Sequence, residues 1–195
     1  ARWNLKYVLS LLEVMKKEET SSYNELVEKT GLTEMETAKW KEVQEKIYLP
    51  RKEGTKLLEQ FEGYFELDNV TIEKYDENDW PIRPEALKTK KAKETQINKQ
   101  ADVVMLLHLM GNEFDDETIK ENYAYYEKRT LHGSSLSPSI YSVMGLKVGD
   151  DSKAYRYLRR AAFIDLLNMQ GNTREGIHAA NTGGVWQTIV FGFAG

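Results

Sequence analysis

Residues 130–138 combine an imidazole, a glycine and several hydroxyl groups in a short stretch that leads into a predicted helix. Ser137 is followed by a proline, which is typical of an N-cap with proline in the first helical turn. The N-terminus of a helix carries unpaired N–H groups and the positive end of the helix dipole, so it attracts anions. We therefore expect His132, Ser134 and Ser135 to bind a small oxyanion, most simply phosphate. A serine-rich turn that only caps the helix is the alternative.

A second candidate anion site lies at residues 182–184, where a threonine and two glycines are predicted to begin the last helix. Glycine has no side chain, so a ligand can approach the backbone N–H groups of Gly183 and Gly184 closely. Two such helix starts in one domain strengthen each other, because both can face a single phosphate. A flexible helix start that packs against a neighbouring element is the alternative.

Lys99 and Gln100 begin the most apolar predicted helix, where an ammonium and an amide suit hydrogen bonds to sugar hydroxyls. Ordinary polarity at a helix end is the alternative. The three histidines lie far apart, so no metal site is predicted, and motifs for nucleotide binding or an activated serine are absent. Carboxylates are abundant, yet none forms an obvious acid–base pair. The sequence predicts binding chemistry without a catalytic residue or an organic cofactor.

The composition describes a globular protein with one sizeable core or two small ones: of 195 residues, 41% are hydrophobic and 30% are charged. A net charge of −4 argues against a nucleic-acid-binding protein, whose surface would be basic. The absence of cysteine excludes disulfides and fits a cytoplasmic protein. The longest apolar run, residues 103–110, is far shorter than the ~20 residues that cross a membrane. No cap precedes Ala1 and no stop signal follows at Gly195, so we expect part of a longer protein.

Apolar periodicity and capping residues predict the helix positions. The expected helices run over residues 1–17, from Ser22 to Gly31, from Thr33 to Pro50, over 99–110, from Asp115 or Asp116 to 126, from Ser137 to Gly149, from Asp151 to Gly171 and from Thr182 onward. Residues 51–98 are punctuated by glycine and proline and predict a long irregular connection. We therefore predict an all-α fold with paired helices.

Five motifs occur in an order that resembles a known family. They are Lys-Gln-Ala-Asp-Val at 99–103, Tyr-Tyr-Glu at 125–127 with Arg129 and Thr130, the stretch at 132–138, residues 170–178, and Gly-Gly-Val-Trp at 183–186. Together they resemble the disaccharide phosphorylases of glycoside hydrolase family 65, which act on maltose, trehalose, kojibiose or nigerose. The likeness is dense from residue 99 to residue 195 and looser over residues 1–50. Residues 51–98 fit the variable connecting region of that family.

This resemblance implies an (α/α)6 barrel, of which residues 1–195 would form the C-terminal portion. It implies inverting phosphorolysis, in which phosphate attacks the anomeric carbon of an α-linked glucosyl unit and yields β-glucose 1-phosphate and a free sugar. Phosphate would be the co-substrate and would take the place of the base that activates water in an inverting hydrolase. The residues implied for phosphate are His132, Ser134, Ser135, Gly183 and Gly184, and those implied for the donor glucose are Lys99 and Gln100.

The family's general-acid glutamate is expected in a segment that precedes Ala1, and a β-sandwich domain and a C-terminal sheet domain are also expected outside these residues. We therefore expect the isolated segment to be inactive, because proton donation to the leaving oxygen contributes about 10²–10⁴-fold. The expected partners are a small disaccharide and phosphate, with neither nucleic acid nor membrane. A homodimer is also expected from the resemblance. The disaccharide linkage is not predicted.

Two other functions stay open on the sequence. A hydrolase of the same family, such as an acid trehalase, would use water in place of phosphate; the His-Gly-Ser-Ser sequence at 132–135 and the glycine pair favour the phosphorylase. A non-catalytic helical interaction module would need helix pairs of fixed period. The predicted helices differ in length, and residues 51–98 interrupt them.

Overall fold

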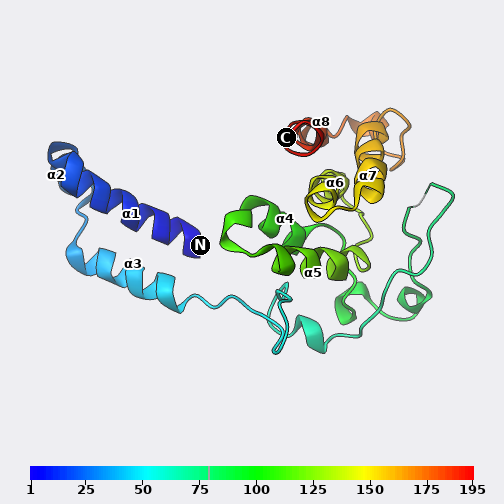
Figure 1. Ribbon diagram of the computed structural model, residues 1–195, viewed down its shortest axis with the longest axis horizontal. Helices are drawn as coiled ribbons and strands as arrows, with labels where there is room; N and C mark the ends of the chain where they lie inside the picture. Colours follow the sequence, from blue (N-terminus) through cyan, green and yellow to red (C-terminus); the bar gives the residue numbers. More distant parts are fainter. Residues whose placement is uncertain (79) are drawn as a thin grey trace. The chain divides into compact units, whose positions relative to one another are not determined.

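The computed structural model describes residues 1–78 and 80–195 and is built mainly from helices (Figure 1). Among the described residues, β-structure is limited to four isolated bridges. The predicted all-α class is therefore confirmed. Within the same residues, no helix combines the length and apolar character needed to cross a membrane. The chain divides into two compact units, Ala1–Leu49 and Pro50–Gly195, and each is described by itself.

The first unit consists of α1 (Arg2–Glu18), α2 (Thr20–Thr30) and α3 (Glu34–Lys46). Helix α1 packs against both α2 and α3, but no residue of these helices is fully buried. The predicted cap at Thr33 is confirmed, because its hydroxyl accepts the Glu36 N–H at 3.2 Å. The predicted helix start at Ser22 is wrong: α2 begins at Thr20, with one residue between it and the end of α1, so Ser22 lies inside its first turn.

The predicted irregular connection contains three short 3₁₀ helices, η1 (Tyr64–Glu66), η2 (Glu85–Lys88) and η3 (Ala92–Glu94). Ile72, Leu87 and Ile97 bury their side chains in one small apolar cluster. Tyr64 is buried as well, and its hydroxyl donates a hydrogen bond of 2.5 Å to the Gln96 carbonyl. These contacts anchor the segment that leads to residue 99.

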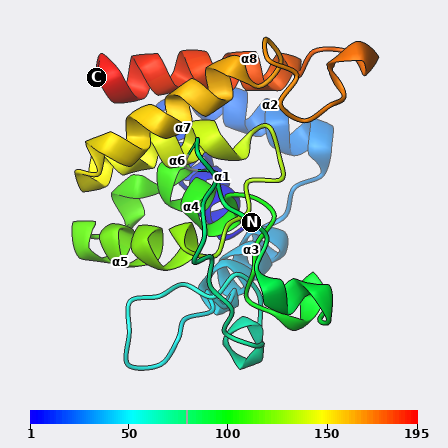
Figure 2. The same cartoon turned by 90° about the vertical axis from the view of Figure 1, so that its right-hand side faces the viewer.

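The second unit is arranged around α6 (Ser137–Val148), whose first nine residues are all buried. It packs against α4 (Asp102–Leu109), α5 (Asp116–Glu127), α7 (Asp151–Phe163) and α8 (Ala179–Thr188). Figure 2 shows α6 and α7 between α8 on one side and α4 with α5 on the other. Apart from the hydroxyl of its tyrosine, the nine buried residues of α6 are apolar or small on every side, which explains its central position.

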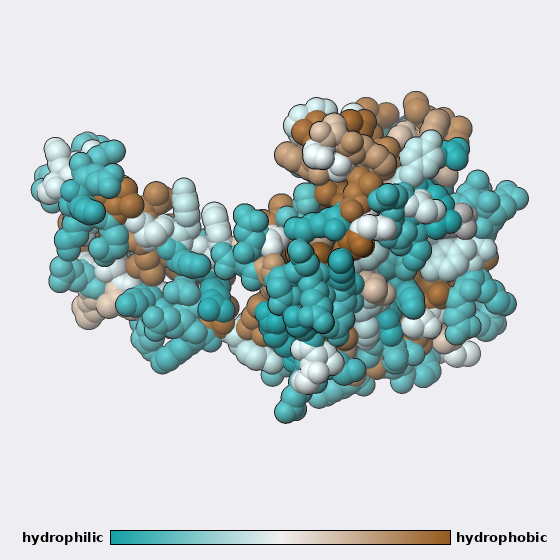
Figure 3. All heavy atoms as spheres, in the orientation of Figure 1, coloured by the Kyte–Doolittle hydropathy of each residue, from teal (hydrophilic) through white to brown (hydrophobic). Residues whose placement is uncertain are grey.

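Helix α8 continues into a π-helix, η6 (Ile189–Phe193), and the two expose large apolar side chains (Figure 3). Trp186 is 60% exposed and Phe191 is 57% exposed, and Ile189 and Phe193 are exposed beside them. Apolar patches of this kind mark contact surfaces in globular proteins.

Three residues that were predicted to cap a helix do not do so in the structure. Ser137 is the first residue of α6 and its side chain does not cap the helix. Asp150, and not Asp151, caps α7 by accepting a backbone N–H. Helix α8 begins at Ala179, so Thr182 and the two glycines after it lie inside the helix. The helix start predicted at Thr182 is therefore wrong.

Gly184 permits the close approach of α8 to α6. A Cβ built on this residue would lie 2.5 Å from the hydroxyl oxygen of Ser139 and 3.0 Å from its Cβ. One turn later, the Thr188 hydroxyl donates to the Ser139 carbonyl at 3.2 Å. The neighbouring Gly183 is exposed, and a Cβ there would meet no described atom within 4 Å. Helix packing therefore requires glycine at 184 but not at 183.

Gly184→Ala should destabilise the protein, because the added methyl group must push Ser139 away from α8, and overpacking costs about 1–3 kcal/mol. Gly183→Ala is the matched control and should be neutral or stabilising, since alanine is favoured over glycine in a helix interior by about 1 kcal/mol. Urea unfolding of both variants measures the difference. Equal stabilities would show that Ser139 moves aside without cost.

Asp115 caps α5, as predicted. Its carboxylate accepts the Thr118 N–H at 2.7 Å and lies 3.1 Å from the Lys56 ammonium. Hydrogen bonding to Thr118, followed by the contact with Lys56, lowers the pKa of Asp115 to about 2. The unfolded pKa is about 3.9, so this carboxylate stabilises the fold above about pH 4, and the contribution is lost as the pH falls toward about 2.

Asp115→Ala should therefore lower the urea midpoint at neutral pH, and its difference from the unchanged protein should shrink as the pH falls from about 4 to about 2. Asp116→Ala is the control, because Asp116 lies in the first turn of α5 without occupying the cap. A midpoint difference for Asp115→Ala that is independent of pH would contradict the role of the ionised carboxylate.

Candidate functional site

Two segments that are distant in the sequence run side by side next to the start of α6. The Asn98 N–H donates to the Arg129 carbonyl at 2.7 Å, and the Leu131 N–H donates to the Asn98 carbonyl at 2.9 Å. Further along both segments, the Gly133 N–H donates to the Lys99 carbonyl at 2.8 Å. This parallel pairing places the predicted sugar-binding segment beside the predicted anion-binding turn.

Gln100 and Ser134 line the same hollow, which has a volume of about 260 Å³. Its other lining residues are Ala101, Asp102, Met105, Leu136, Ser137 and Ile140. The Gln100 amide donates to Asp102 at 3.1 Å, which orients its side chain. Lys99 is exposed, and Ser135 is half-buried in the same turn as Ser134. The structure therefore brings four of the predicted site residues to one part of the surface.

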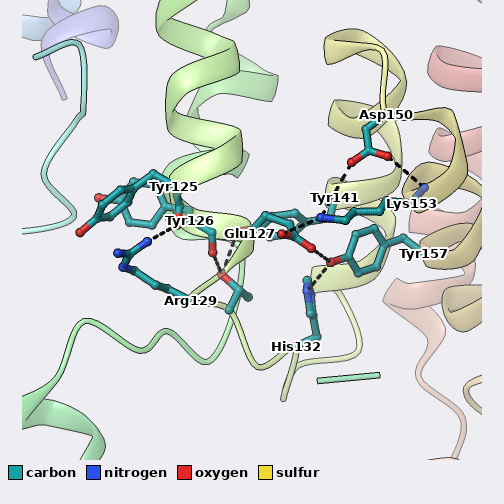
Figure 4. A network of polar contacts seen from close by, with 10 residues as sticks. Tyr125, Tyr126, Glu127, Arg129, His132, Tyr141, Asp150, Lys153 and Tyr157 are labelled. Atoms are coloured by element: carbon teal, nitrogen blue, oxygen red, sulfur yellow. Dashed lines mark hydrogen bonds and ion pairs between the residues drawn. The ribbon is translucent and has the colours of Figure 1, made fainter. Parts of the chain in front are cut away.

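His132 lies in the core and not on that surface. It is 2% exposed, and both ring nitrogens have partners: Nδ1 lies 2.9 Å from Ser137 Oγ, and Nε2 lies 3.1 Å from the Tyr157 hydroxyl. Tyr157 donates in turn to Glu127 at 3.1 Å, and Glu127 forms an ion pair with Lys153 at 2.9 Å. Figure 4 shows Tyr157 between His132 and Glu127 in this network.

The His132 imidazole is neutral at physiological pH. Burial lowers its pKa to about 3, and the positive charge of Arg160 acts in the same direction. A neutral ring with both nitrogens occupied offers an anion neither charge nor a free donor. Its backbone has φ of 51°, in the left-handed region. Phosphate binding by the His132 ring stays a prediction, while the structure gives the ring a role in holding that turn.

Gly183 and Gly184 lie in the second turn of α8, which begins at Ala179. The unpaired helix-start N–H groups that were the reason for choosing them are therefore not at these positions. Gly184 contacts Ser139, which lies in the first turn of α6, four residues after Ser135. Phosphate binding by the two glycines stays a prediction. In the structure they form a stretch of helix without side chains, near the first turn of α6.

Glu127, Tyr157 and Asp165 have no role predicted from the sequence. Tyr157 shares the buried face of α7 with two alanines, and a hydroxyl on such a face needs a polar partner, which is a signal that the sequence does contain. Asp165 orients His178 by contacting its Nδ1 at 2.6 Å and its backbone N–H at 2.8 Å. Among the described residues, no cluster of three potential ligands could hold a metal ion.

Comparison with known proteins identifies the family of the chain. Residues 1–187 match the model of the family described as the glycosyl hydrolase family 65 central catalytic domain. The kojibiose phosphorylase of Thermoanaerobacter brockii is 53% identical over 195 residues, and the alpha,alpha-trehalose phosphorylase of the same organism is 33% identical over 195 residues. Both alignments cover 100% of this chain and only 25% of the relative.

A solved structure titled as a putative kojibiose phosphorylase from human microbiome has a TM-score of 0.78 and 32% sequence identity to this chain. The match covers 96% of this chain and 25% of that one. The helical fold is thus that of a part of an (α/α)6 barrel, as predicted. The family match over nearly the whole chain shows that it belongs to glycosyl hydrolase family 65, within the central catalytic domain.

Proposed function

We propose that this chain is part of the catalytic domain of an inverting disaccharide phosphorylase. The enzyme transfers the glucosyl unit of an α-linked glucose disaccharide to inorganic phosphate. The glycosidic C1–O bond breaks, a new C1–O bond to phosphate forms, and β-glucose 1-phosphate and a free sugar leave. Family membership and the phosphorylase names of the relatives support this proposal. The observation that carries it is the pairing of the segment at 98–99 with the backbone at 129–133.

The proposed donor site and phosphate site lie on the two paired segments. Lys99 and Gln100 hold hydroxyls of the donor glucose, since an ammonium and an amide together supply donors and an acceptor. Ser134 and Ser135 bind phosphate through their hydroxyls, next to the start of α6, where the helix dipole favours an anion.

Three further residues complete the proposed phosphate site. Gly183 and Gly184 leave a stretch of α8 without side chains, so that phosphate can approach it closely. His132 contributes by holding the turn that carries the two serines, through its bond to Ser137.

The proton for the leaving sugar oxygen comes, in this proposal, from a carboxylic acid in another segment of the enzyme. Phosphate is already an anionic nucleophile, so it needs no base, unlike the water of an inverting hydrolase. Because general-acid catalysis contributes about 10²–10⁴-fold, the 195-residue chain by itself should show no turnover. Assembly into a homodimer stays a prediction.

Kojibiose is the first substrate to test. Two relatives named kojibiose phosphorylase are each 53% identical to this chain, whereas the trehalose phosphorylase from Thermoanaerobacter brockii is 33% identical and the maltose phosphorylase from Bacillus subtilis 30%. The donor half is a glucosyl unit in every case, so the linkage and the acceptor are what the assay must determine.

The full-length enzyme that contains this segment should release glucose 1-phosphate from kojibiose only when inorganic phosphate is present. Proton NMR of the anomeric signal should show the β-anomer, and trehalose, maltose and nigerose serve as comparison substrates. Glucose release without phosphate would instead indicate a trehalase-like hydrolase. A folded full-length enzyme that cleaves none of the four disaccharides would favour a helical interaction module.

A further inference from the structure

The hydrogen bonds between Glu127, Tyr157, His132 and Ser137, called here the Glu127 network, have a fixed direction. Glu127 is 4% exposed and pairs with the Lys153 ammonium at 2.9 Å, so it is an ionised carboxylate that can only accept. Tyr157 has one hydroxyl proton, which it donates to Glu127 at 3.1 Å. The oxygen of Tyr157 is therefore an acceptor toward every other neighbour.

The direction of the Tyr157 bond determines the tautomer of His132. Nε2 lies 3.1 Å from the Tyr157 oxygen and must carry the proton, since the tyrosine has none left to donate. A neutral imidazole has one N–H, so Nδ1 is unprotonated and accepts the Ser137 hydroxyl proton at 2.9 Å. The carboxylate thus sets the protonation of a ring that it does not touch.

The far end of the Glu127 network is attached to residues 132–136, called here the serine turn. Ser137, whose hydroxyl donates to His132, also donates its N–H to the Ser134 carbonyl at 3.1 Å. The turn begins at His132 with a left-handed backbone, which costs a non-glycine residue energy and persists only where surrounding contacts hold it. The imidazole is therefore fixed at both nitrogens, and Ser137 links it to the turn that contains Ser134 and Ser135.

Lys153 keeps the negative charge of Glu127 from opposing an anion nearby. Its ammonium lies 2.9 Å from one Glu127 oxygen, while the Tyr157 hydroxyl binds the other. Both oxygens of the buried carboxylate therefore have a hydrogen-bond or ion-pair partner. The carboxylate can orient the turn without repelling an anion bound to it.

We propose that Glu127, acting through Tyr157, is a positioning residue for the phosphate site: it fixes His132 as the Nε2–H tautomer and so holds the turn that presents Ser134 and Ser135. This inference rests on the proposed function above. It assigns Glu127 and Tyr157 to phosphate affinity and not to the proton transfer or to sugar binding.

The proposal predicts that Glu127→Gln and Tyr157→Phe in the full-length enzyme change the KM for phosphate but not the KM for the disaccharide. The KM for phosphate should rise about tenfold in each variant, as expected for the loss of one buried hydrogen bond to a charged group. The KM for the disaccharide should stay within about twofold at saturating phosphate, because the segment at 98–99 keeps its backbone pairing. An unchanged KM for phosphate in both variants would overturn the proposal.

Tyr125→Phe is the matched control. Tyr125 also lies near the end of α5, and its hydroxyl donates to Gln96 without joining the Glu127 network. This variant should keep the phosphate KM of the unchanged enzyme. An equal rise in Tyr125→Phe would show general loosening of the fold, and would overturn the specific role of Glu127.

The tautomer of His132 gives a readout that does not need activity. The 195-residue chain contains three histidines, so ¹⁵N-histidine labelling with His132→Gln identifies its signals. The unchanged chain should show protonated Nε2 and unprotonated Nδ1. Glu127→Gln should increase the Nδ1–H form, because a glutamine amide can donate to Tyr157 and reverse the bonds. An Nδ1–H imidazole in the unchanged chain would overturn the Glu127 network.

The two proposals fail in different ways. An unchanged enzyme whose turnover does not depend on phosphate refutes the proposed function, whatever the variants show. A phosphate-dependent enzyme whose Glu127→Gln and Tyr157→Phe variants bind phosphate normally refutes only the positioning role. If Tyr157→Phe does not fold, Glu127→Gln decides alone, since it keeps the size and shape of the side chain.

Discussion

Burying a carboxylate costs free energy of desolvation unless strong hydrogen-bond donors surround it. The candidate site depends on the donors that surround Glu127. Its two donors, Lys153 and Tyr157, both come from α7, while Glu127 is the last residue of α5. Tyr157 extends the contact to His132, which precedes α6. One polar cluster therefore ties three helices together at the point where the serine turn begins.

Backbone pairing supplies the second constraint on the site. The bonds between residues 98–99 and 129–133 join a segment of the long connection to the end of α5. That connection is itself held by buried side chains such as Tyr64 and Ile72. The irregular connection at residues 51–98 thus determines the position of Lys99 and Gln100.

Local signals in the sequence were sufficient for the helical class and for caps that act within one turn, such as Thr33 and Asp115. They failed where the outcome depends on distant residues. A glycine pair indicates either an open helix start or a close helix contact, and only the position of Ser139 decides between them for Gly184. The burial of His132 likewise could not be predicted, because its partners Tyr157 and Glu127 are distant in the sequence.

Helices α1, α2 and α3 contain no fully buried residue, so we expect them to open more easily than the rest of the chain. Their backbone hydrogen bonds are covered by few apolar contacts, so opening them requires little free energy, whereas α6 is enclosed over its first nine residues. Amide protons of the first unit should exchange with solvent early, and those of α6 late. The ordered scaffold under the serine turn thus persists through fluctuations that already open the N-terminal helices.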